Sequence, residues 1–129
     1  MTIQLLLRVM ALIEGATGLS LLFWPPLQAR QIMGVAVRTP LEMFLGRSFG
    51  TALVAIAMVC WLAASEARGK VARGVVVAML IYNAIAAALL VHARVVLELS
   101  GALYWVGIVV HVTMGAWCIA CLQRNSIAE

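Results

Sequence analysis

Four long apolar blocks constrain this chain more than any other feature of its sequence. They run over residues 3–24, 43–64, 74–93 and 101–122, and short polar connections separate them. Each block has about the length of the roughly 20 residues that a helix needs to cross the hydrocarbon core of a bilayer. Its backbone must be helical because hydrocarbon offers no partner to unpaired N–H and C=O groups. The sequence predicts an all-α integral membrane protein, a single antiparallel four-helix bundle over residues 1–129.

The composition excludes several other classes of protein. Of the 129 residues, 65% are hydrophobic and only 11% are charged, whereas soluble domains are about 45–50% apolar and about 25% charged. Four spans leave only short loops, so a separate catalytic domain is excluded, and three cysteines do not make a disulfide scaffold. The net charge of +4 is interpreted as loop charge that sets membrane topology. The expected partner is the lipid bilayer, and no nucleic acid is expected.

The connections predict where the first helix ends and how it is retained. Pro25 and Pro26 end it because neither can donate the next backbone hydrogen bond. The connection over residues 25–40 is the longest, with room for a short interfacial helix. The first block is not expected to be a cleaved signal peptide, since Glu14 interrupts its apolar run and no small-x-small site precedes Trp24.

The distribution of basic residues predicts the orientation. With four spans, both termini and the middle loop share one side of the membrane, and cytoplasmic loops carry the excess of Lys and Arg. That rule favours both termini in the cytoplasm. The shared side holds Arg8, Arg68, Lys70, Arg73 and Arg124, and the other side holds Arg30, Arg38 and Arg94.

Small residues predict where the helices touch. In lipid, close backbone approach and dispersion replace the hydrophobic drive, so glycines and alanines belong at helix contacts. Gly15 and Gly18 punctuate the first block, and Gly46 and Gly50 form a GxxxG in the second. We expect a compact bundle that forms a homo-oligomer or joins a larger membrane complex.

Three polar side chains fall at about the same membrane depth. Glu14, Asn83 and His111 lie near the middle of the first, third and fourth blocks. An ionisable group at the midplane costs at least about 2.5 kcal/mol, so it normally faces the bundle interior and marks a site. The sequence therefore predicts a protonatable polar site that binds or moves a small hydrophobic or cationic ligand.

Neighbouring side chains complete the predicted site. Methionines about one helical turn from each polar residue suit an adaptable apolar pocket. Helical spacing also puts further residues on the same helix faces as Glu14 and His111. No metal site is predicted. The expected ligand-binding residues are Glu14, Asn83, His111, Met10, Thr17, Met79, Tyr104 and Met114.

Two other functions stay open, and whether the protein is an enzyme is undecided. One alternative is a non-catalytic structural or accessory subunit of a larger membrane complex. The other is a haem- or quinone-linked redox protein. His92 and His111 differ in level by on the order of 10–15 Å, too far for one haem to join them. No cofactor is expected, with haem b on His111 alone as the arrangement left open.

Cys118 and Cys121 form a CxxC that resembles the redox motif of the vitamin K epoxide reductase family, another four-helix membrane fold. That family needs a second cysteine pair on a loop, and Cys60 is the one other cysteine here. The pair also falls at the predicted cytoplasmic end, where thiols stay reduced. We therefore expect Cys118 and Cys121 to be reduced apolar packing residues.

Two further resemblances concern transport and general layout. The segment Ala11–Gly18, with Glu14 at its centre, is similar to the first helix of small multidrug resistance transporters, which exchange protons for cations. More of the chain resembles the DoxX-like group of small bacterial four-helix membrane proteins. That likeness rests on Arg8, the glycine-spaced first helix, the Pro25-Pro26 stop and the Gly46–Gly50 motif. It implies a multi-pass protein of the bacterial inner membrane rather than a particular reaction.

Overall fold

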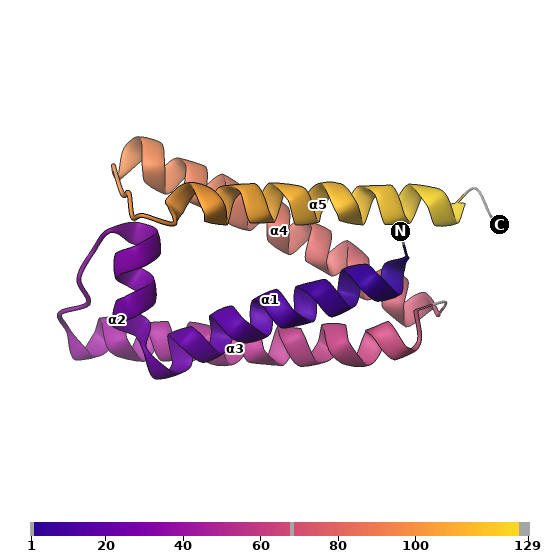
Figure 1. Ribbon diagram of the computed structural model, residues 1–129, viewed down its shortest axis with the longest axis horizontal. Helices are drawn as coiled ribbons and strands as arrows, with labels where there is room; N and C mark the ends of the chain where they lie inside the picture. Colours follow the sequence, from indigo (N-terminus) through magenta and orange to yellow (C-terminus); the bar gives the residue numbers. More distant parts are fainter. Residues whose placement is uncertain (1, 68, 127–129) are drawn as a thin grey trace.

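A computed structural model describes residues 2–67 and 69–126, and long helices dominate them (Figure 1). Each of the four long helices is long and apolar enough to cross a membrane. The described residues contain no strand, so the all-α membrane fold is confirmed. The long helices are α1 (Ile3–Phe23), α3 (Pro40–Ser65), α4 (Lys70–Val96) and α5 (Tyr104–Ser126).

The connection between the first two spans contains helical structure. The helix α1 stops at Phe23, and Pro25 opens the short α2 (Pro25–Gln28), where the absent N–H of proline leaves no bond unmade. A π-helical turn, η1 (Ala29–Met33), follows directly and ends at Gly34, which adopts a left-handed conformation with φ of 73°. We call α2 and η1 together the strap.

The second and third spans extend beyond their apolar blocks. The helix α3 begins at Pro40 because Thr39 caps it: the Thr39 side chain accepts from the Glu42 N–H, and Glu42 Oε2 accepts from the Thr39 N–H. The helix α4 starts at Lys70 and continues through Arg94 to Val96. A helix can continue through charged residues once it has left the hydrocarbon. The length of the apolar block is therefore shorter than the length of the helix.

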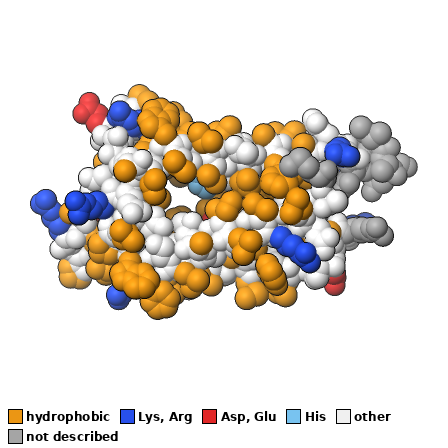
Figure 2. Space-filling view, viewed as in Figure 1, with side chains coloured by type: hydrophobic (Ala, Val, Ile, Leu, Met, Phe, Trp, Pro, Cys, Tyr) orange, Lys and Arg blue, Asp and Glu red, His pale blue; other side chains and the backbone are white. Residues whose placement is uncertain are grey.

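The outward faces of the long helices are apolar (Figure 2). Leu12, Leu62 and Leu89 on three different helices are each more than 60% exposed. Side chains of this kind have no stable place in water but suit lipid tails. These surfaces therefore contact the bilayer.

The long helices pack as two pairs, α1 with α3 and α4 with α5 (Figure 1). The first pair meets backbone to backbone: a Cβ on Gly18 would lie 2.8 Å from the Gly50 carbonyl oxygen, and a Cβ on Gly50 would lie 2.7 Å from the Gly18 oxygen. Only glycine allows this approach, as expected for small residues at a membrane helix contact.

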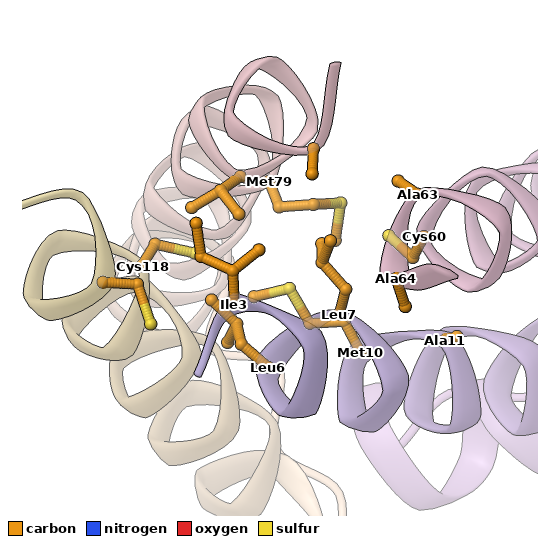
Figure 3. Packing of buried hydrophobic residues seen from close by; sticks show 13 residues of the cluster. Ile3, Leu6, Leu7, Met10, Ala11, Cys60, Ala63, Ala64, Met79 and Cys118 are labelled. Atoms are coloured by element: carbon orange, nitrogen blue, oxygen red, sulfur yellow. The ribbon is translucent and has the colours of Figure 1, made fainter. Parts of the chain in front are cut away.

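The two pairs converge at the end of the bundle that holds both chain termini and the turn between α3 and α4, here called the terminal end (Figures 1 and 3). Buried apolar side chains from all four long helices meet there. This cluster consists of Ile3, Leu6, Leu7, Met10, Ala11, Cys60, Ala63, Ala64, Ala72, Val76, Met79, Cys118 and Cys121.

At the opposite end, here called the loop end, the strap joins one pair to the other. The Gly101 N–H donates to the Ile32 carbonyl at 3.0 Å, and the Leu103 N–H donates to the Gln31 carbonyl at 2.9 Å. Gly101 also passes so close to the Gln31 carbonyl that no side chain would fit between them. The two pairs are therefore joined at both ends of the bundle, and the space between them lies in the middle.

Membrane topology gives a first testable prediction. The start of α1 and the end of α5 both lie at the terminal end (Figure 1), so reporter fusions after Glu129 and inside the 25–40 connection should report opposite sides of the membrane. From the positive-inside bias, the fusion after Glu129 should be cytoplasmic. Matching sides for the two fusions would contradict the four-span topology.

Candidate functional site

Glu14 is the buried carboxylic acid at the centre of the molecule. It lies near the middle of α1 and is only 5% exposed. Its partner is Tyr82 on α4, whose hydroxyl donates to Glu14 Oε2 at 3.0 Å. This hydrogen bond joins a helix of the first pair to a helix of the second.

Asn83 and His111 form a second polar contact, between α4 and α5. Asn83 is 1% exposed, and its Nδ2 donates to the Met79 carbonyl at 2.8 Å. Its Oδ1 faces His111 Nδ1 at 2.9 Å. Because an amide oxygen only accepts, Nδ1 must carry the hydrogen. In the neutral ring, Nε2 is then an acceptor with a lone pair.

Tyr82 connects the two polar contacts. Its ring meets the His111 ring edge-on, with centroids 5.6 Å apart and planes at 76°, a favourable aromatic arrangement. Tyr82 and Asn83 are consecutive on α4, so their side chains leave the helix about 100° apart, at 3.6 residues per turn. One reaches Glu14 on α1 and the other reaches His111 on α5.

The polar network lies between the two helix pairs, since the Tyr82–Glu14 hydrogen bond joins α4 to α1. Figure 2 shows a hollow in the side of the bundle, with pale blue histidine and red acidic atoms inside the opening. Within the described residues, Glu14 Oε1 and His111 Nε2 have no hydrogen-bond partner, so both can receive a ligand.

The predicted methionines lie on the terminal side of this network. Met10 and Met79 belong to the buried apolar cluster, and half-buried Met114 packs against it. Met79 contributes through its backbone carbonyl, which holds the Asn83 amide. These methionines therefore belong to the packed terminal end of the bundle.

The two remaining predicted residues have different positions. Thr17 is half-buried, one helical turn beyond Glu14. Tyr104 is fully buried, and its hydroxyl donates to the Leu90 carbonyl. This contact ties the start of α5 to the last turns of α4 at the loop end, apart from the Glu14 network.

Tyr82 is the site residue that sequence reasoning missed. Tyr and Trp in membrane proteins are enriched at the headgroup level, so a tyrosine is not an obvious candidate for a midplane site. Tyr82, however, lies far from both ends of α4 and directly precedes the midplane Asn83. A hydroxyl at that depth needs a partner in the protein, and this was the available signal.

The three cysteines are free thiols in the buried cluster, with Cys118 0% and Cys121 3% exposed. Within residues 2–67 and 69–126, no three His, Cys, Asp or Glu side chains come together as metal ligands. His92 is exposed on the last third of α4, away from the buried His111 contact.

The cysteine positions give a second testable prediction. Replacing both Cys118 and Cys121 by alanine should leave the bundle folded, because the pair packs as small apolar side chains. Non-reducing mass analysis of the unmodified protein should find no disulfide. Loss of function in the double variant, together with a disulfide in the parent protein, would revive the redox interpretation.

Comparison with known protein families, curated proteins and solved structures finds no match for this chain. The fold defines a multi-pass helical membrane protein with a buried polar centre. The likeness to DoxX-like proteins stays a prediction.

Proposed function

We propose that this protein binds a small hydrophobic or cationic molecule in the hollow between its two helix pairs. The observation that carries the proposal is the buried Glu14 carboxylate, held between the two helix pairs by Tyr82, whose ring also contacts His111. An ionisable side chain inside a membrane bundle is costly and commonly marks a substrate or ion pathway.

The hydrogen bonding supports binding over a purely structural role. A polar network that only locks helices together satisfies its members with one another. Here Glu14 pairs with Tyr82 and His111 pairs with Asn83, which leaves one acceptor of Glu14 and one of His111 without a protein partner in the described residues. Serine or threonine would also serve as interhelical glue without burying an ionisable group.

The shape of the molecule supports access from the lipid. The apolar cluster fills the terminal end and the strap crosses the loop end, while the hollow opens on the side of the bundle (Figures 1 and 2). In a membrane, that side faces lipid tails. A ligand that arrives this way partitions into the bilayer, which favours a molecule with a substantial apolar part.

Native mass spectrometry of the protein purified in its own lipid tests this proposal. The unmodified protein should carry a small-molecule adduct, and Glu14→Gln should lose it because the amide cannot ionise. Glu66→Gln is the matched control, since Glu66 is exposed in the turn after α3, and it should keep the adduct.

The other outcomes would overturn the proposal. An identical pattern in all three proteins would mean that Glu14 does not hold a ligand. A protein partner that always co-purifies, with no small-molecule adduct, would identify an accessory subunit instead. A coloured preparation that retains its cofactor in Glu14→Gln would support the redox alternative.

A further inference from the structure

We infer that the ligand of this site is a lipophilic amine that donates N–H hydrogen bonds to Glu14 and His111. The inference rests on the proposed function and adds the chemical class of the ligand. It follows from counting the donors and acceptors that the polar network uses internally and those that it leaves for a ligand.

The polar hydrogens of Tyr82 and His111, and one of the two on the Asn83 amide nitrogen, have partners inside the protein. The Tyr82 hydroxyl donates to Glu14, and the His111 Nδ1–H donates to Asn83 Oδ1. The Asn83 amide donates to the Met79 carbonyl. The acceptors left over are Glu14 Oε1, when Glu14 is ionised, and His111 Nε2, when the ring is neutral. The second Asn83 N–H belongs to a side chain that is only 1% exposed.

A site that offers acceptors selects a ligand that donates. A ketone or quinone would bring its own carbonyl oxygen against these acceptors and gain no hydrogen bond. A carboxylate would be repelled by Glu14. A primary ammonium carries three N–H donors and a positive charge that matches Glu14, and hydrogen bonds with charged partners are roughly twice as strong as neutral ones.

The surroundings require the rest of the ligand to be apolar. Hydrophobic side chains surround the opening of the hollow (Figure 2), and the apolar cluster on the terminal side of the network includes flexible methionines. An alkyl or aromatic tail attached to the amine would lie along these side chains. A quaternary ammonium has the charge and the tail but no N–H donor. Comparing its binding with that of the primary amine therefore separates charge attraction from hydrogen bonding.

Calorimetric titration of the protein in phosphatidylcholine nanodiscs tests the inference with four probes of equal chain length: decylamine, decyltrimethylammonium, decanol and decanoate. Empty nanodiscs correct for partition into lipid. Decylamine should bind saturably to one site, and the other three should bind at least about tenfold more weakly, the lower bound for losing a charged hydrogen bond. Decylamine binding should weaken as the pH falls, because protons compete for Glu14.

Two variants complete the experiment, and both must first show an unchanged helical spectrum and elution volume. Glu14→Gln should weaken decylamine binding by at least about tenfold, and Glu66→Gln should leave it unchanged. Equal or tighter binding of decyltrimethylammonium, decanol or decanoate overturns the amine inference.

The amine inference and the proposed function fail in distinguishable ways. If decanol or decanoate binds saturably and Glu14→Gln abolishes that binding, the site exists and only the ligand class is wrong. The same holds if no probe binds while a Glu14-dependent adduct is present in the native mass spectrum. If neither probe nor adduct depends on Glu14, both proposals are wrong.

Discussion

Replacing Gly50 by alanine is expected to lower the free energy of unfolding by about 1–3 kcal/mol, the usual range for overpacking a filled contact. The new methyl group would lie 2.7 Å from the Gly18 carbonyl oxygen and 2.7 Å from the Leu22 nitrogen. Both are backbone atoms of a helix, so neither can move aside as a flexible side chain would. The helices α1 and α3 must therefore move apart. Because α1 carries Glu14, this movement also displaces Glu14.

Gly74→Ala is the matched control for this prediction. Gly74 is also a helical glycine in a membrane span, but a Cβ there meets no atom within 4 Å. Alanine should be neutral or stabilising by up to about 1 kcal/mol, since it favours the helix over glycine. Reversible unfolding in mixed detergent micelles measures both. An equal response of the two variants would contradict the close approach of α1 and α3.

Replacing Glu14 by alanine is expected to destabilise the bundle, whereas glutamine should preserve its stability. Alanine removes the acceptor of the Tyr82 hydroxyl, and interhelical hydrogen bonds in membranes contribute roughly 0.6–1.7 kcal/mol. Glutamine keeps the size of the side chain and an oxygen that can accept from Tyr82. The same unfolding assay distinguishes the variants.

A double-mutant cycle with Tyr82→Phe checks that the lost stability belongs to this contact. If Glu14 and Tyr82 act through their hydrogen bond, Phe should cost little more once alanine is present at position 14, so the two losses should not add. Additive losses would contradict the contact. A loss for glutamine as large as for alanine would mean that the ionisable group itself holds the fold together, which would weaken the case for a ligand.

The sequence alone determined the number, position and helical nature of the spans, because hydrocarbon imposes both the length and the internal hydrogen bonding of anything that crosses it. It also indicated that Glu14, Asn83 and His111 lie at about the same membrane depth, since each residue adds a fixed rise along a helix. Glycine spacing predicted that Gly18 and Gly50 lie at helix contacts, and the structure showed that they meet each other. The sequence also contains the capping-box pattern at the start of α3, a threonine at position 39 followed three residues later by Glu42.

The tertiary structure alone decided how these elements meet. Rotation about each helix axis and the choice of neighbour depend on contacts between residues far apart in the chain, which spacing along one helix does not specify. Tyr82 thus became the partner of Glu14, which depends on α1 and α4 being turned toward each other. The strap contact at Gly101, and the hollow that it helps to enclose, depend on two loops meeting at one end of the bundle.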